Sequence, residues 1–226
     1  MFKNKSPIPA QMIVDLFETR DSGTGKGLFA KTFIPKGTIV SFECDKDKYY
    51  DEEYFKTLKG RKKVFFLKYN YRRQDNIYVS PNNISKYQNH SCNSNILDSR
   101  LGFEIVVRDI NKGEEATCDY RIFNDLEEQS FKCQCRSKNC CEVVNCTEPK
   151  QTQFFKQWDQ RIFLALKKIN QVNQPIKNAL LIKNPELNSL FETTRTSLKG
   201  FQSQEPITQQ QIPSQRKVAT PHLNSF

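Results

Sequence analysis

A dense group of cysteines is the feature that most constrains how this chain of 226 residues folds. Five of its eight cysteines fall within fourteen consecutive residues, namely Cys133, Cys135, Cys140, Cys141 and Cys146. Thiolates at such short spacing are typical of structural zinc sites, in which four ligands surround the metal tetrahedrally. Free buried thiols are the alternative, but this density favours metal ligands. We therefore predict a small module held together by Zn²⁺.

The spacing settles only part of the ligand set. Cys133, Cys135 and Cys140 suit one face of a tetrahedral zinc ion. The fourth ligand stays open, because Cys141 and Cys146 are local candidates and Cys92 is a distant one.

The chain before these cysteines reads mostly as β-structure, and the chain after them reads as helix. Short β-prone runs bounded by Gly and Pro-Lys-Gly turns predict strands at residues 27–33, 38–44, 103–108 and 115–120. Beyond the cysteines, apolar residues recur every three or four positions, at Phe155, Trp158, Ile162, Leu166 and Ile169. We expect this helical stripe to pack on the front of the chain rather than to bind a partner.

Composition places limits on the environment of the protein. No stretch approaches the roughly 18 apolar residues of a membrane helix, and the first residues lack the apolar core of a signal peptide. We therefore expect a soluble, intracellular protein with no membrane partner, in the nucleus or the cytoplasm.

Charge is distributed unevenly along the chain. The net charge of +10 favours an acidic partner such as nucleic acid, and residues 56–73 hold eight basic and no acidic residues. Aromatic residues interleave with these charges, at Phe65, Phe66, Tyr69 and Tyr71. Residues 74–128 have the opposite character, with five basic and ten acidic residues, which suits a cationic substrate.

Three motifs before the cysteines are unremarkable one by one. Gly25-Lys26-Gly27 is followed by a predicted strand, so it matches neither a dinucleotide fingerprint, which needs a helix there, nor a phosphate loop. Asn89-His90 lies in a polar stretch, and Tyr120 ends a predicted strand. Each alone is as well explained by a turn, a solvated loop or a core residue.

Their order and spacing are more specific. Gly-x-Gly-Leu-Phe-Ala, Asn-His-Ser-Cys, Gly-Glu-Glu-x-x-x-Asp-Tyr and Cys-x-Cys-x4-Cys begin at residues 25, 89, 113 and 133. With these four motifs, about residues 11–147 resemble the SET-domain protein-lysine methyltransferases that carry a post-SET zinc motif.

The resemblance implies a fold and a division of the chain. The fold is mostly β (α+β), a SET-domain β-clip with a pseudoknot, followed by a post-SET zinc module and a C-terminal helical extension. The implied parts are an N-terminal tail, the SET domain, the post-SET segment, the helical extension and a disordered tail, at residues 1–10, 11–122, 129–147, 150–199 and 200–226.

The resemblance also assigns candidate residues for transfer of a methyl group from S-adenosyl-L-methionine to a protein lysine. Tyr120 matches the catalytic tyrosine. The cofactor-binding positions match Gly25, Lys26, Gly27, Leu28, Phe29, Asn89 and His90. The four zinc thiolates match Cys92, Cys133, Cys135 and Cys140. Four acidic residues near Tyr120 form either an acidic mouth that attracts a lysine flanked by basic residues, as in histone tails, or a charged loop leading into the cysteines, namely Asp119, Asp125, Glu127 and Glu128.

Departures from the family pattern leave one alternative open, and the basic segment at residues 56–73 leaves a second. Cys118 replaces an aromatic residue that limits the number of methyl groups added, so the degree of methylation stays undetermined. Glu43 stands near the position of a second channel tyrosine, and Cys141 is an additional candidate ligand. The alternatives are a catalytically inactive, zinc-stapled interaction module and a protein that binds nucleic acid through residues 56–73.

Overall fold

The protein is described from a computed structural model, which covers most of the chain. The described residues are 15–23, 25–43, 46–73, 75–123, 130–144 and 152–192. The predicted tails at 1–10 and 200–226 lie outside them. The described part contains four small sheets and several short helices, which confirms the mostly β prediction.

The first sheet brings together strands that are far apart in the sequence. Its order is β1-β2-β10-β7. The strands are β1 (Phe17–Asp21), β2 (Lys26–Ala30), β10 (Glu115–Cys118) and β7 (Asn89–His90). β1 and β2 form an antiparallel hairpin, whereas β7 runs parallel to β10. The Asn-His segment therefore lies beside the strand that leads to Tyr120.

The second sheet lies at the centre of the core. It consists of β3 (Ile39–Phe42), β9 (Phe103–Val106) and β8 (Ile96–Asp98), in that order. Neighbouring residues point to opposite faces, so Ile105 belongs to one buried cluster and Val106 to another. Both faces of this sheet are buried.

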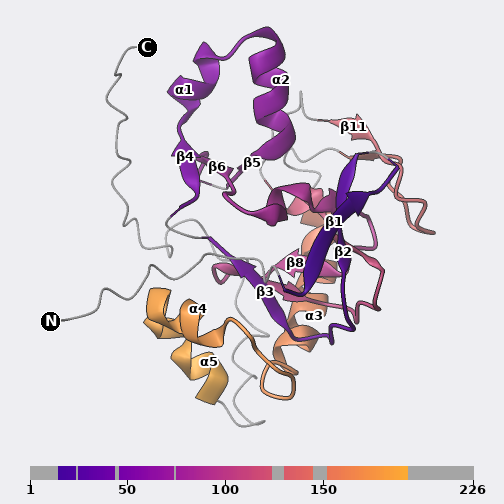
Figure 1. The fold of residues 1–226 in the computed structure, drawn as a ribbon, viewed down its shortest axis with the longest axis vertical. Helices are drawn as coiled ribbons and strands as arrows, with labels where there is room; N and C mark the ends of the chain where they lie inside the picture. The colour runs from indigo at the N-terminus through magenta and orange to yellow at the C-terminus, as the bar shows by residue number, and fades with distance from the viewer. Residues whose placement is uncertain are drawn as a thin grey trace, which may run out of the picture. The chain divides into compact units, whose positions relative to one another are not determined.

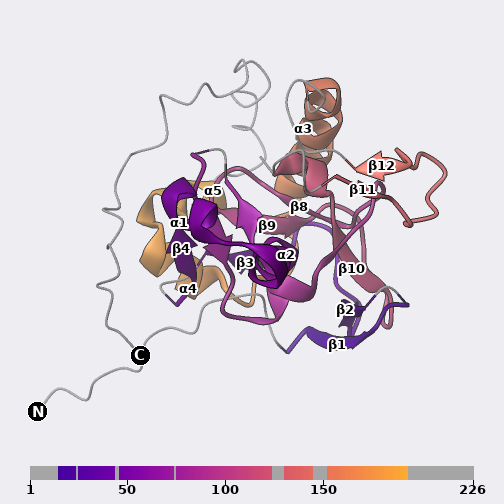
Figure 2. The ribbon, with the colours of Figure 1, turned by 90° about the horizontal axis from the view of Figure 1, so that it is seen from above.

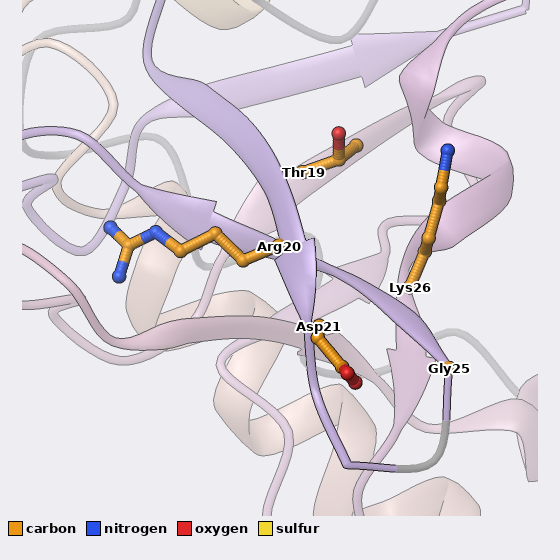
Figure 3. A pocket seen from close by; sticks show the side chains of 5 residues that line it. All are labelled: Thr19, Arg20, Asp21, Gly25 and Lys26. Carbon is orange, nitrogen blue, oxygen red and sulfur yellow. The ribbon is translucent and has the colours of Figure 1, made fainter.

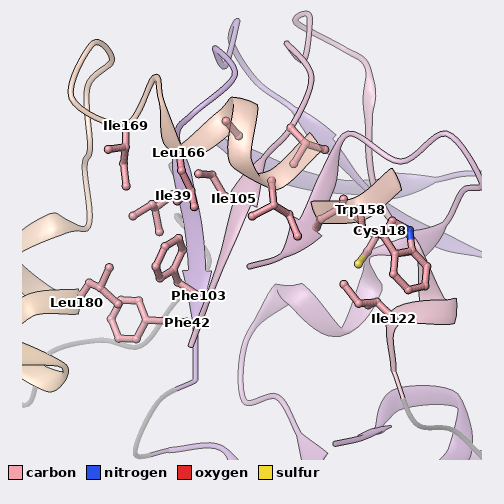
Figure 4. Close-up of a cluster of buried hydrophobic side chains, with 14 residues drawn as sticks. Ile39, Phe42, Phe103, Ile105, Cys118, Ile122, Trp158, Leu166, Ile169 and Leu180 are labelled. Carbon is pink, nitrogen blue, oxygen red and sulfur yellow. The ribbon is translucent and has the colours of Figure 1, made fainter. Parts of the chain in front are cut away.

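The C-terminal helices cover one face of this central sheet. They are α3 (Thr152–Leu166), α4 (Lys177–Lys183) and α5 (Asn188–Glu192), with a 3₁₀ turn, η4 (Pro185–Leu187), before α5. Trp158 and Leu180 lie in the same buried cluster as Ile39 and Phe103 (Figure 4). The predicted helical stripe thus packs on the front of the chain, as expected.

The third sheet carries a helical insert. The sheet contains β4 (Lys48–Tyr50), β6 (Tyr78–Ser80) and β5 (Tyr71–Arg72), and the insert contains α1 (Glu52–Thr57) and α2 (Gly60–Tyr69). The side chain of Asp51 caps α1 by accepting a hydrogen bond from the Tyr54 N–H. In Figure 1, α1 and α2 lie above the strands β4, β5 and β6. Phe55, Phe66 and Tyr78 form a small core that joins these helices to the sheet.

The cysteine segment contributes the fourth sheet. It has only two strands of two residues, β11 (Phe131–Lys132) and β12 (Val143–Val144), near β10 (Figure 2). Two further 3₁₀ turns flank the candidate site, η1 (Ile84–Tyr87) and η2 (Tyr120–Ile122). Among the helices of the described residues, none is long and apolar enough to cross a membrane.

Candidate functional site

The parallel pair of β7 and β10 joins two of the sequence motifs. Asn89 lies opposite Thr117, and His90 lies opposite Cys118. Beyond the end of β10, the backbone N–H of Tyr120 donates a hydrogen bond to His90 Nδ1 over 3.1 Å. The two rings lie 5.5 Å apart between centroids. The structure therefore brings the candidate cofactor pair into contact with the candidate catalytic tyrosine.

Asn89 connects this pair to the glycine motif. Its Nδ2 donates to the carbonyl oxygen of Lys26 over 3.2 Å, to Ser22 Oγ over 3.2 Å and to Glu115 Oε1 over 2.8 Å. Gly27 lies against these groups, since a Cβ atom added there would collide with the side chains of Glu115 and Asn89. A side chain at position 27 would displace the end of the Glu115 side chain, and glycine avoids this displacement.

A hollow of about 540 Å³ opens beside the β1–β2 turn (Figure 3). It is lined by Thr19, Arg20, Asp21, Gly25 and Lys26. Gly25 has φ +131° and open space around its Cα, so its backbone is accessible from this side. Gly27 and Leu28 are buried residues of β2, and Phe29 is half-buried under the guanidinium of Arg20.

Tyr120 is half-buried between the first sheet and the cysteine segment. Its hydroxyl donates to the carbonyl oxygen of Gln88 over 2.5 Å. Its ring centroid lies 6.2 Å from that of Phe123 and 6.1 Å from that of Phe131. The hydroxyl thus points to the backbone immediately before Asn89, and the aromatic side chains of Phe123 and Phe131 lie next to the Tyr120 ring.

Asp119 is buried and does not belong to an acidic mouth, contrary to the sequence-based suggestion. Its carboxylate accepts hydrogen bonds from Arg121 Nε over 2.8 Å, Arg121 Nη2 over 2.5 Å and Trp158 Nε1 over 3.1 Å. These bonds anchor helix α3 to the segment that carries Tyr120. The remaining members of that acidic group, Asp125, Glu127 and Glu128, lie outside the described residues.

Burial sets the protonation of the groups next to Tyr120. It lowers the pKa of His90 to about 4, although Asp119 acts in the opposite direction. A neutral imidazole is the form whose Nδ1 accepts the Tyr120 N–H. Burial also raises the pKa of the Cys118 thiol well above its usual range, with further contributions from Glu104 and Asp119. Cys118 is therefore a protonated, buried thiol.

Sequence reasoning missed the role of Tyr71. Its hydroxyl donates to Glu43 Oε1 over 3.1 Å, while Glu43 Oε2 accepts from Tyr49 and Arg73 over 3.3 and 2.9 Å. The Tyr71 ring lies 4.9 Å from that of Phe123, which in turn neighbours Tyr120. The carboxylate at position 43 was the available signal, because a partly buried carboxylate needs hydrogen-bond donors, and the Tyr71 hydroxyl is one of them.

The cysteines from the two distant segments meet beside His90. The sulfur atoms of Cys92, Cys133, Cys135 and Cys140 all lie within 4.8 Å of one another. The Cys92 and Cys133 sulfurs are 3.8 Å apart, close to the roughly 3.8 Å that Zn–S bonds of about 2.3 Å impose in a tetrahedron. This donor set fits a structural zinc ion.

A second group of donors shares two of these cysteines. It consists of His90, Cys92, Cys133 and Cys141, again within 4.8 Å of one another. The sulfur of Cys141 lies 3.4 Å from that of Cys92. Cys146, the other local candidate, lies outside the described residues. Cys141 is therefore a candidate ligand in this second group, which contains neither Cys135 nor Cys140.

Comparisons with known proteins agree with the motifs. Residues 25–121 match the family model described as "SET domain". Over 132 residues, covering 53% of this chain, the sequence is 29% identical to the histone-lysine N-methyltransferase set1 of Dictyostelium discoideum. The match spans only 8% of that protein's length.

A solved structure also resembles the chain. It is the crystal structure of KRYPTONITE in complex with mCHG DNA and SAH, with 18% sequence identity and a TM-score of 0.41. The similarity covers 56% of this chain and 29% of that one. The part of the chain that carries the ordered motifs, residues 25–121, thus matches the SET-domain family model.

Proposed function

We propose that this SET domain transfers a methyl group from S-adenosyl-L-methionine to the side-chain amine of a protein lysine. The observation that carries the proposal is the contact of the Tyr120 N–H with His90 Nδ1, across the paired β7 and β10. The Dictyostelium relative, a histone-lysine N-methyltransferase by name, supports the same chemistry, although this chain spans only a small part of it.

The cofactor would lie along β2 and β7. The residues proposed to hold it are Gly25, Lys26, Gly27, Leu28, Phe29, Asn89 and His90. The accessible backbone at Gly25 and the bare Cα of Gly27 beside Asn89 suit a ligand that runs close to the main chain. When bound, S-adenosyl-L-methionine supplies an electrophilic methyl group on a sulfonium.

The residues around Tyr120 would prepare the lysine. A free lysine has a pKa of about 10.4, so removing its proton at pH 7 costs roughly 4 to 5 kcal/mol. The aromatic surroundings provided by Phe123 and Tyr71 favour the neutral amine through desolvation. We assign the Tyr120 hydroxyl to orient this amine in line with the methyl group, without acting as an obligatory base.

The zinc ion would fasten the cysteine segment over this site. We propose Cys92, Cys133, Cys135 and Cys140 as its ligands, because their sulfurs fit a tetrahedral ion and Cys92 belongs to the loop after His90. We also propose limits of 11–122 for the SET domain, 129–147 for the post-SET segment and 150–199 for the helical extension.

The proposed substrate is a lysine flanked by basic residues, with histone tails as the first candidates. Residues 74–128, which include the site, hold twice as many acidic as basic residues, and this favours a cationic peptide. Such a substrate implies a protein that works inside the cell, in the nucleus or the cytoplasm.

The test is transfer of a radiolabelled methyl group onto histones and whole-cell lysate, with mass spectrometry of any modified lysine. We expect Tyr120→Phe to lower the rate by about a hundredfold or more, because the amine loses its orienting hydroxyl. Tyr54→Phe, a change at a partly exposed tyrosine on α1, should leave the rate unchanged. Normal turnover by folded Tyr120→Phe protein would contradict the assignment.

Calorimetry separates an active enzyme from an inactive module. We expect the wild-type protein to bind S-adenosyl-L-methionine, and Asn89→Ala to weaken that binding, since its amide ties β2 to β7. A protein that binds the cofactor and methylates none of the offered lysines would favour a different substrate. Absence of binding would favour the inactive interaction module.

A further inference from the structure

The outer face of helix α2 exposes large apolar side chains in a strongly basic setting. Phe65 and Val64 are 67% and 69% exposed, whereas Phe66 on the opposite face is buried in the core of the insert. The helix contains four basic and no acidic residues. Phe65 and Tyr69, one helical turn apart, place their ring centroids 4.9 Å from each other.

This aromatic row continues beyond the helix. The ring of Tyr87, at the end of η1, lies 6.1 Å from that of Tyr69. Residues 18 positions apart in the sequence thus form one row of three rings, and Tyr87 was not recognised from the sequence. Phe66 and Tyr71, which the sequence had grouped with this surface, face the interior and do not belong to it.

Lysine ammonium groups accompany the rings. Lys68 Nζ lies 5.4 Å from the centroid of Tyr69, and Lys86 Nζ and Lys26 Nζ lie 5.4 and 5.2 Å from that of Tyr87. All three lysines are exposed, and within the described part of the chain none of them forms an ion pair. Their charge is therefore available to an anionic ligand.

We propose that this surface, which we call the aromatic–lysine ladder, binds single-stranded nucleic acid. It comprises Phe65, Tyr69, Tyr87, Lys26, Lys68 and Lys86. Phe65 is the exposed ring on which an unpaired base stacks, whereas Tyr69 and Tyr87 are half-buried and hold the three lysines that neutralise the phosphates. The bases of a duplex are already stacked on one another and would leave Phe65 without a role. The ladder shares Lys26 with the proposed cofactor site, whereas Phe65, Tyr69 and Lys68 belong to α2, outside that site.

Fluorescence anisotropy tests the proposal with the full chain and labelled 20-mers of oligo(dT), oligo(U) and mixed-sequence duplex DNA. The measurements use no S-adenosyl-L-methionine and no lysine substrate, so they stand apart from the proposed methyl transfer. We expect the single strands to bind more tightly than the duplex. Phe65→Ala should weaken single-strand binding by about tenfold, through loss of one stacking platform.

The contribution of the lysines is measured separately, from the salt dependence of the binding affinity. The double variant Lys68→Gln/Lys86→Gln should reduce the slope of log affinity against log salt by about 0.7 for each phosphate that is no longer neutralised. The matched control is Lys112→Gln/Lys156→Gln, which removes two exposed lysines outside the ladder and should match the wild type in slope to within about 0.3.

Several results would overturn the proposal. One is no binding to any oligonucleotide at low salt. Another is binding that Phe65→Ala leaves unchanged, or that the control pair weakens as much as the ladder pair. Tighter binding of duplex than of single strands, or of poly-glutamate than of either, would assign the surface to a different anionic partner and would likewise contradict it.

Discussion

Two neighbouring parts of the molecule are held together in different ways. Around β7 and β10, the buried side chain of Asn95 is bonded to β10: its Nδ2 donates to the Glu115 carbonyl over 2.8 Å, and its Oδ1 accepts from the Thr117 N–H over 2.8 Å. In residues 130–144, by contrast, Cys133 and Val144 are the only buried residues, and both residues of β11 are exposed. Packing shapes the first part, whereas the second has little besides its thiols to define its shape.

Chelation of the proposed zinc is expected to have the largest effect, and only on the cysteine segment. In small zinc domains the metal contributes on the order of 10 kcal/mol to folding, which the short β11–β12 pair cannot replace. Hydrogen exchange should show residues 130–144 losing protection while residues 115–118 keep it. Equal loss of protection in both segments, or no loss in either, would contradict the view that the metal shapes only the cysteine segment.

Trp158→Ala should act on the packed part instead. Trp158 is 1% exposed, and its indole N–H donates to Asp119. We expect the free energy of unfolding, measured in urea, to fall by about 3 to 5 kcal/mol, with the zinc content of the folded protein unchanged. Phe33→Ala removes an aromatic side chain that is 54% exposed and should cost at most about 0.5 kcal/mol. If Trp158→Ala lost zinc while its free energy of unfolding stayed unchanged, Trp158 would support the cysteine segment and not the packed part.

A buried carboxyl makes the packed part sensitive to pH. Burial, together with cross-strand Asp98, raises the pKa of Glu104 to about 7 from 4.5. The folded chain thus holds this proton more tightly than the unfolded chain, so the associated stability is full below about pH 4.5 and is lost as pH rises towards 7. Glu104→Gln, which stays neutral, should remove about 1 to 3 kcal/mol of the stability difference between pH 5 and pH 8.

Urea unfolding of both proteins at the two pH values measures this difference. Glu18→Gln, a change on the exposed strand β1, serves as the control and should retain the pH dependence of the wild type. If the free energy of unfolding changed equally between pH 5 and pH 8 in the wild type and in Glu104→Gln, Glu104 would ionise as freely in the folded chain as in the unfolded one.

The smallest effect concerns the extra thiol of the cysteine segment. If Cys135 is a ligand and Cys141 only a neighbour, Cys135→Ser should weaken zinc retention against a competing chelator by at least about tenfold. Cys141→Ser should change it by less than about threefold, with one zinc per chain in both wild type and variant. The reverse order would assign the ion to the group that contains His90 and Cys141.

Much of the architecture was predictable from local patterns. The β-prone runs at 103–108 and 115–120 contain β9 and β10. The stripe from Phe155 to Leu166 lies on α3 as predicted, whereas Ile169 follows the end of the helix but still belongs to the buried cluster. These predictions succeed because they depend on periodicity along a single element. Motif order was enough to place Asn89, His90 and Tyr120 in one proposed site.

The failures concern side chains whose surroundings come from elsewhere in the chain. Asp119 looked like a surface charge, but its partners include Trp158, 39 positions away. Tyr71 looked like part of a basic surface, but Glu43 draws its hydroxyl inward. Nothing in the sequence singled out Tyr87, whose ring lies next to that of Tyr69 in the structure. Local sequence carries no information on such pairings, since they depend on which elements the fold places side by side.

The position of Trp158 has a consequence for spectroscopy. It is the only tryptophan of the chain, and its indole N–H is bonded to the carboxylate beside Tyr120. Intrinsic fluorescence excited at the indole band therefore originates from a single place, the junction of helix α3 with the segment that ends in Tyr120. Shifts in its emission would report on the packing of that junction directly, with no label attached to the protein.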